Sequence, residues 1–153
     1  MRPEDAEEML RDRLARRCAL LVIDVQCAFT DDDGSFARFG NDTAPMRGAL
    51  PRIARLLRKA RRARIPLVHV RSEGPAWLSW PAHVAPPRML AGARRTLAGP
   101  PMLEPGTREV EFAHGAEPEP GEIVITKHVF DAFLGTPLDW ILHRAGVDAQ
   151  GSR

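Results

Sequence analysis

A short apolar run that ends on a carboxylate constrains the fold of this chain more than any other feature. Residues 19–23 are Ala, Leu, Leu, Val and Ile, and Asp24 follows them directly. An unbroken run rich in branched apolar residues is typical of a strand buried on both faces, as in a parallel sheet. Such a strand places Asp24 at its carboxyl end, where open α/β sheets bind their ligands. The alternative is that Asp24 only caps a turn or the next helix.

Two further apolar segments extend this pattern into an α/β fold. Residues 65–70 and 122–126 predict a second and a third strand. Between the first two strands we expect a helix that begins at Pro45 or Pro51 and ends near Arg64. Strand, helix and strand within about fifty residues are typical of a βαβ unit.

Helices are also predicted near both ends of the chain. Residues 4–16 have the pattern of a short amphipathic helix. A last helix is expected with Thr136 as its N-cap, Pro137 as its first residue and Gly146 as its stop. A length of 153 residues suggests one domain, 1–153.

The helix before the second strand is predicted to have one apolar and one basic face. Four apolar residues at helical spacing form the expected core-facing stripe: Ile53, Leu56, Leu57 and Ala60. Basic residues cover the rest: Arg52, Arg55, Arg58, Lys59, Arg61 and Arg62. A solvated helix face explains them better than nucleic-acid binding, because the net charge is only +2. No apolar run is long enough to span a bilayer. We therefore expect no nucleic-acid or membrane partner, and a cytoplasmic location.

Two predicted strands end on opposite charges, Asp24 after the first and Lys127 after the third. If both open into one crevice, each charge needs the other, because an isolated buried charge is costly. A carboxylate beside an ammonium in an enclosed pocket is half of an acid/base site, which still needs a nucleophile or an activated water. A purely structural salt bridge is the alternative.

A long segment without regular structure is predicted between the second and third strands. Residues 72–121 are irregular, and a loop of that length is typical of a lid or a pocket wall. Trp77 and Trp80 lie near its start. They either line a pocket or seal the loop onto the core.

Three segments, LLVIDVQCAF, IPLVHVRSEG and IVITKHVFDAFLGTPLDWILHRAGV, resemble the isochorismatase-like cysteine hydrolase family. The resemblance extends from Arg17 to Val147 and looks closest to the ureidoacrylate and carbamoyl-amide amidohydrolase branch. It implies a Rossmann-like three-layer α/β/α sandwich around a mostly parallel sheet. It also implies hydrolysis of a small amide, urea or carbamoyl compound. Members of the family are commonly oligomers, so the expected partners are a small-molecule substrate and further copies of the chain.

The resemblance implies roles for individual residues. Asp24 matches the catalytic aspartate, a general base or proton shuttle. Lys127 matches the catalytic lysine, which holds that aspartate charged and lowers the pKa of the nucleophilic thiol. Gln26 and Phe29 match positions that line the pocket. Metal-dependent members carry an Asp-x-His motif after the second strand, and it is absent here, so we expect no metal and no cofactor.

The third member of the family's Asp-Lys-Cys triad has no counterpart in this sequence. The family's Cys opens the helix after the next strand, so the resemblance implies a domain that is truncated at its C-terminus. Cys18 is expected to be an inert core thiol, and Cys27, just past Asp24, is a weak candidate for a substitute nucleophile. The chain is therefore either a hydrolase acting on C–N bonds or a catalytically dead fragment or pseudoenzyme that binds a small ligand or a partner subunit.

Overall fold

The computed structural model describes residues 18–74 and 102–147. The expected helix over residues 4–16 and both Trp77 and Trp80 lie outside the described residues. The described elements, in chain order, are β1 (Leu20–Ile23), α2 (Cys27–Thr30), α3 (Ser35–Arg38), α4 (Ala44–Arg62), β2 (Leu67–Ser72), η2 (Arg108–Val110), β3 (Ile123–Lys127) and α6 (Leu138–Arg144).

The described strands form one parallel sheet in the order β1-β2-β3. Leu20 lies opposite Leu67, and Ser72 lies opposite Lys127. Parallel neighbours need a crossover connection, and α4 provides it between β1 and β2. The predicted α/β class is confirmed. Both later strands end further along the chain than predicted, so that Ser72 and Lys127 belong to strands.

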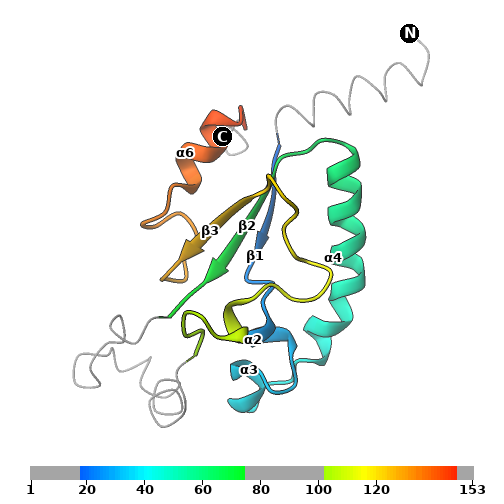
Figure 1. Ribbon diagram of the computed structural model, residues 1–153, viewed down its shortest axis with the longest axis vertical. Coiled ribbons are helices and arrows are strands. Elements are labelled where there is room, and N and C mark those ends of the chain that lie inside the picture. Colours follow the sequence, from blue (N-terminus) through cyan, green and yellow to red (C-terminus); the bar gives the residue numbers. More distant parts are fainter. Residues whose placement is uncertain (1–17, 75–101, 148–153) are drawn as a thin grey trace, which may run out of the picture.

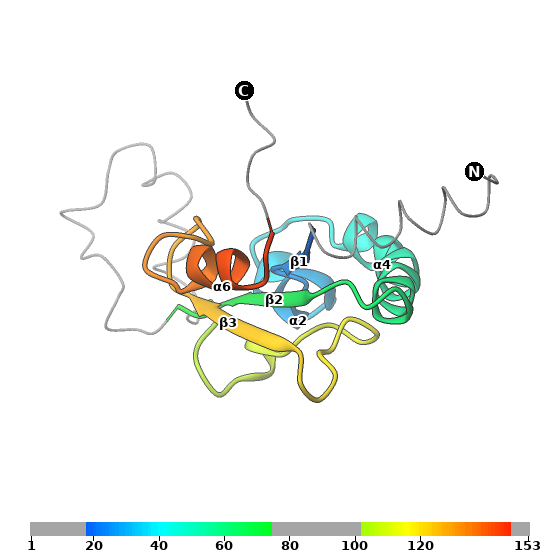
Figure 2. The same ribbon diagram turned by 90° about the horizontal axis from the view of Figure 1, so that it is seen from above.

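Helices cover both faces of this sheet, and Figure 2 shows α4 and α6 on opposite sides of it. One buried cluster joins α4 to the sheet: Val22, Leu57, Ala60, Leu67 and Ala116. Another joins α6 to the other face: Val68, Val70, Ile125, Ala132 and Leu138. Successive residues of a strand point to opposite faces, which is why neighbours in β2 belong to different clusters. The arrangement is the expected three-layer α/β/α sandwich.

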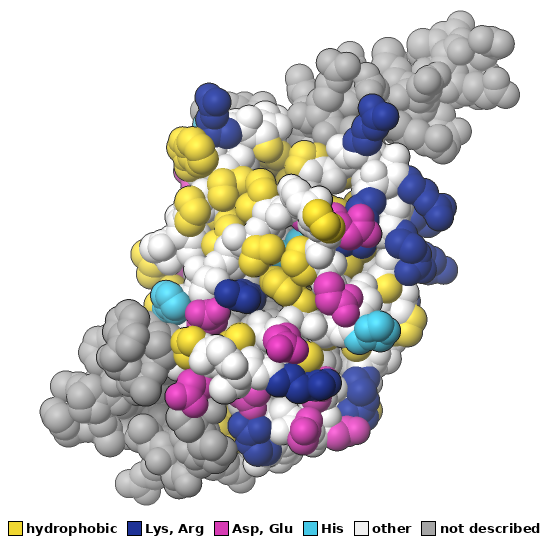
Figure 3. Space-filling view, in the orientation of Figure 1, with side chains coloured by type: hydrophobic (Ala, Val, Ile, Leu, Met, Phe, Trp, Pro, Cys, Tyr) yellow, Lys and Arg dark blue, Asp and Glu magenta, His cyan; other side chains and the backbone are white. Residues whose placement is uncertain are grey.

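The helix α4 differs from the prediction at one apolar position. Leu57 and Ala60 are buried as predicted, but Leu56 is 52% exposed, so the prediction for Leu56 is wrong. A helix turns about 100° per residue, which places Leu56 far to the side of its neighbour Leu57. The basic residues are exposed as expected, except for Arg61, and Figure 3 shows Lys and Arg side chains gathered over α4.

The helix α6 begins one residue later than predicted. Its N-cap is Pro137 rather than Thr136. The Thr136 hydroxyl still accepts a hydrogen bond from the Leu138 backbone N–H at 3.2 Å. Gly146 follows the helix with a φ of 71°, a conformation that glycine adopts without strain.

The short helices α2 and α3 lie beyond the carboxyl end of β1 (Figure 1). Ala28, Leu103 and Val110 form a small buried cluster there, with Phe29 packed against it. Gly34 precedes α3, and a side chain at this position would meet the Ala28 carbonyl oxygen at 2.6 Å. Only glycine therefore allows α2 and α3 to approach this closely. In residues 18–74 and 102–147, no helix has the length and apolar character needed to cross a membrane.

Candidate active site

Groups at the carboxyl ends of the described strands β2 and β3 converge on the carboxylate of Asp24, which follows β1. The Lys127 ammonium Nζ lies 3.0 Å from Asp24 Oδ2. The Ser72 hydroxyl donates a hydrogen bond to Asp24 Oδ1 at 2.8 Å. Asp24 follows β1, Ser72 ends β2 and Lys127 ends β3. The two charges therefore meet at the edge of the sheet where α/β proteins bind ligands.

The two charged groups of this pair differ in their access to water. The Lys127 side chain is only 2% exposed, whereas that of Asp24 is 33% exposed. The ammonium also donates to the backbone carbonyl oxygens of Val129, at 3.3 Å, and Phe130, at 3.2 Å. An ammonium has three donors, so all of them are used. The lysine is a buried, fully bonded cation, and the aspartate is the member that a ligand can reach.

The backbone at Asp24 adopts an uncommon conformation. Its φ is 58°, in the left-handed region that residues other than glycine rarely occupy. Such a conformation costs about 1–3 kcal/mol and is found preferentially at functional sites, although aspartate tolerates it better than most residues. The Asp24 N–H donates to the Val70 carbonyl at 2.9 Å, and the Asp24 carbonyl accepts from the Gln26 N–H at 2.9 Å. These bonds hold the turn in which the chain leaves β1.

Gln26, predicted to line the pocket, is fully buried and braces the strand ends. Its Nε2 donates to the carbonyl oxygens of Ser72, at 2.9 Å, and Val110, at 3.1 Å. Its Oε1 accepts from the Ser72 N–H at 2.7 Å. One amide side chain therefore ties the segment after β1 to the end of β2 and to η2.

Phe29, also predicted to line the pocket, packs in the small cluster beside α2. Its ring meets that of Phe36 edge to face, with 5.9 Å between the ring centres. Its described contacts are thus apolar and lie on the α2–α3 side.

Neither cysteine has the surroundings of a reactive thiolate beside the pair. Cys18 precedes β1, at the end of the sheet opposite to Asp24. Cys27 is buried, and its Sγ lies 3.8 Å from the Phe112 carbonyl oxygen. Burial and the nearby negative charge of Asp31 raise the pKa of the Cys27 thiol. A raised pKa disfavours the thiolate, which is the nucleophilic form.

A pocket of about 400 Å³ lies beside α2 and α3, and Cys27 is part of its wall. Four of its charged side chains form two ion pairs. Arg108 is 2.9 Å from Asp31, and Arg38 is 2.6 Å from Glu109. Asp24 and Lys127 are not among its lining residues. The pocket is thus separate from the pair of Asp24 and Lys127. A ligand in it would have to compete with the existing ion pairs for Arg108 and Arg38.

Two of the three aspartates in the run 31–33 pair with arginines. Arg108 pairs with Asp31, and Arg47 pairs with Asp32. Within the part of the chain that the structure describes, no three His, Cys, Asp or Glu side chains are grouped as metal ligands.

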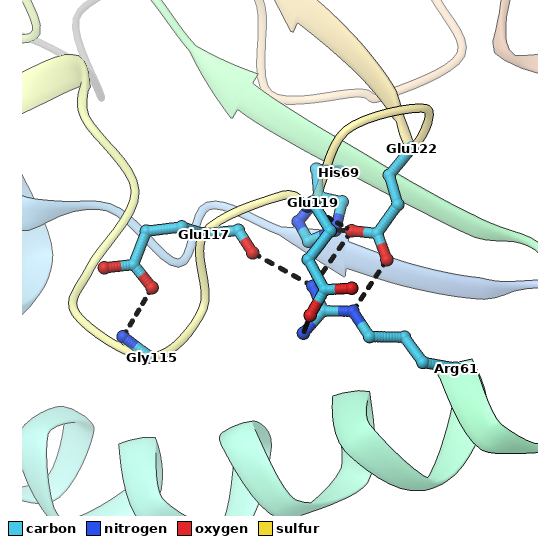
Figure 4. Close-up of polar contacts among 6 residues, drawn as sticks. All are labelled: Arg61, His69, Gly115, Glu117, Glu119 and Glu122. Atoms are coloured by element: carbon cyan, nitrogen blue, oxygen red, sulfur yellow. Dashed lines mark hydrogen bonds and ion pairs between the residues drawn. The ribbon is translucent and has the colours of Figure 1, made fainter.

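A second charged network, which sequence reasoning did not identify, lies between α4 and the sheet (Figure 4). Glu122 accepts hydrogen bonds from Arg61 Nε at 2.7 Å, and His69 Nε2 lies 2.9 Å from its other oxygen. These bonds, those of Arg61 above all, lower the pKa of Glu122 to about 2. Burial lowers the pKa of His69. The network joins α4, β2 and the start of β3, so its role is to hold the layers together.

Comparison with known proteins identifies the family of this chain. The Isochorismatase domain profile matches residues 18–149. The ureidoacrylate amidohydrolase RutB of Methylobacterium radiotolerans is 32% identical over 137 residues, which cover 84% of this chain and 52% of the relative. The chain thus spans about half the length of such curated relatives.

Solved structures show the same fold. An isochorismatase family protein from Desulfovibrio vulgaris subsp. vulgaris str. Hildenborough is 33% identical with a TM-score of 0.63, over 87% of this chain and 64% of that one. The N-carbamoylsarcosine amidase of Thermoplasma acidophilum is 24% identical with a TM-score of 0.60, over 86% of this chain and 64% of that one, a likeness of fold. With a profile match over most of its residues, this chain belongs to the isochorismatase family.

Proposed function

We propose that this chain carries the Asp-Lys part of a hydrolase site that cleaves a C–N bond in a small amide, urea or carbamoyl compound. The observation that carries the proposal is the 3.0 Å contact between Asp24 and Lys127 at the carboxyl ends of parallel strands. Family membership and the name of the ureidoacrylate amidohydrolase relative support the reaction class.

In this proposal the solvent-accessible Asp24 carboxylate accepts a proton from the attacking water molecule and later returns it to the leaving nitrogen. Lys127 keeps the negative charge of Asp24 balanced and its position constant. Water is the second reactant: the C–N bond breaks, the carbonyl carbon gains an oxygen, and the nitrogen leaves as ammonia or an amine. The proposed site includes Gln26 as the brace of the strand ends, with Phe29, Trp77 and Trp80 as pocket residues.

The test is release of ammonia by the purified 153-residue chain from ureidoacrylate, N-carbamoyl amino acids and simple amides. We expect turnover of at least one compound, and a loss of at least about 100-fold in Asp24→Asn and in Lys127→Met, the usual contribution of acid–base catalysis. Asp33→Asn, an exposed carboxylate of the neighbouring loop, is the matched control and retains the rate. Equal rates in all four proteins would refute the roles of the pair.

A pseudoenzyme that binds a small ligand or a partner subunit is the second candidate. The absence of a suitable nucleophilic thiol among the described residues favours it. Cys18 lies at the end of β1 opposite to Asp24, and Cys27 has a raised pKa. This candidate predicts saturable binding of a urea or carbamoyl compound, measured by calorimetry, without ammonia release. Binding would weaken in Asp24→Asn and persist in Asp33→Asn. A homo-oligomer and a cytoplasmic location stay predictions under both candidates.

A further inference from the structure

The two oxygens of the Asp24 carboxylate are held from two different strands. Oδ1 accepts from the Ser72 hydroxyl of β2 at 2.8 Å, and Oδ2 pairs with the Lys127 ammonium of β3 at 3.0 Å. The terminal torsion of an aspartate is broad, so a carboxylate held through one oxygen rotates readily. Contacts to both oxygens fix the plane of the group. Lys127 alone does not achieve this.

Ser72 is itself held in place on both sides of its backbone. Its N–H donates to Gln26 Oε1 at 2.7 Å, and its carbonyl accepts from Gln26 Nε2 at 2.9 Å. Ser72 is also the register partner of Lys127 in the sheet. The hydroxyl therefore projects from a backbone that a fully buried amide side chain and a neighbouring strand hold in place.

We propose that Ser72 is a positioning residue that orients the Asp24 carboxylate. The inference rests on the proposed function, in which Asp24 transfers the proton. An ionised carboxylate only accepts hydrogen bonds, so the serine O–H must donate to it. The Ser72 hydrogen is committed to Asp24, which leaves the remaining lone pairs of the carboxylate to accept the transferred proton. Ser72 thus acts through Asp24.

The test is the ¹³C resonance of the Asp24 carboxyl carbon at neutral pH, assigned by its loss in Asp24→Asn. We expect Ser72→Ala to move this resonance more than that of any other aspartate, because it removes a hydrogen bond to one oxygen. Ser72→Thr keeps a hydroxyl and restores the wild-type position. Thr126→Val is the control: it removes a hydroxyl at the same sheet edge that bonds Arg71, at 3.1 Å, and leaves the resonance in place.

An unchanged resonance in a folded Ser72→Ala protein would overturn the inference, as would an equal shift in Thr126→Val. If Ser72→Ala does not fold, Ser72→Cys replaces it, since a thiol occupies the position of the hydroxyl and is a weaker donor. Ser72→Cys must then move the resonance away from the wild-type position, which Ser72→Thr keeps, and failure to do so overturns the inference. The NMR result does not depend on turnover. Absence of ammonia release from the wild-type chain therefore counts against the proposed function alone.

Discussion

Lys127 and Asp24 form one ion pair, yet the lysine is 2% exposed and the aspartate 33% exposed. The ammonium depends on its partner for charge compensation because water does not reach it. The carboxylate is partly hydrated and has Ser72 as a second bonding partner. Loss of Asp24 and loss of Lys127 should therefore lower the free energy of unfolding by different amounts.

Asp24→Asn should lower the free energy of unfolding by about 3 kcal/mol, because it leaves a buried ammonium without a counter-charge. Lys127→Met should cost less, about 1.5 kcal/mol, the contribution of a charged hydrogen bond, because water and Ser72 still serve the carboxylate. Urea unfolding at pH 7 measures both. Asparagine tolerates the left-handed backbone as well as aspartate does, so the first variant isolates the charge. Equal losses, or the reverse order, would contradict the inequality.

Gln26→Leu should lower the free energy of unfolding by at least about 3 kcal/mol. The substitution leaves three backbone groups without their partner, namely Ser72 N–H, the Ser72 carbonyl and the Val110 carbonyl, and an unpaired buried group costs about 1–3 kcal/mol. Asn41→Ala is the control, since Asn41 donates one exposed bond to the Phe36 carbonyl. A loss no larger than that of the control would show that the brace is dispensable.

The Glu122 network should make the fold sensitive to acid. The pKa of Glu122 is about 2 in the folded protein and near 4.5 in the unfolded chain. Its contribution to the free energy of unfolding is therefore complete above pH 4.5 and is lost as the pH falls toward 2. This depression corresponds to a contribution on the order of 3 kcal/mol. His69 also lowers the free energy of unfolding as the pH falls, but at higher pH. Its pKa is lowered in the folded protein, so below about pH 6.5 the unfolded chain takes up the proton first.

Urea unfolding between pH 7 and pH 3 checks this dependence. Glu122→Gln should flatten the decline below pH 4.5. Glu119→Gln, which alters a carboxylate that pairs with the same Arg61 at 3.1 Å but is 62% exposed, should leave the decline nearly as in the wild type. Parallel curves for wild type and Glu122→Gln would contradict the prediction.

The Cys27 thiol should react slowly with disulfide reagents at pH 7 in the folded chain and rapidly in urea. Its pKa is raised by burial and by Asp31, while Arg108 acts in the opposite direction. In a Cys18→Ala background, Asp31→Asn should speed labelling and Arg108→Gln should slow it. Fast labelling of the folded wild type would reopen the case for Cys27 as a nucleophile.

The positions of Asp24 and Lys127 were predictable because they depend on local patterns. An apolar run that stops at a charge identifies a strand end, and parallel strands end at one edge of the sheet. The family resemblance led to the same two residues, which lie 3.0 Å apart. Leu56 was assigned to the buried stripe because spacing places a residue near a face but does not say how far the core extends around the helix.

The sequence by itself determined the α/β class, the parallel sheet and the two charges at its edge, since strand and helix periodicity depend on neighbouring residues. Only the tertiary structure decided three contacts: the hydrogen bond from Ser72 to Asp24, the bonds between Gln26 and Ser72, and the pairing of Arg61 with Glu122 instead of with solvent. These contacts join residues 46 to 61 positions apart. They depend on strand register and on which polar groups are removed from water together, and packing of the whole chain sets both.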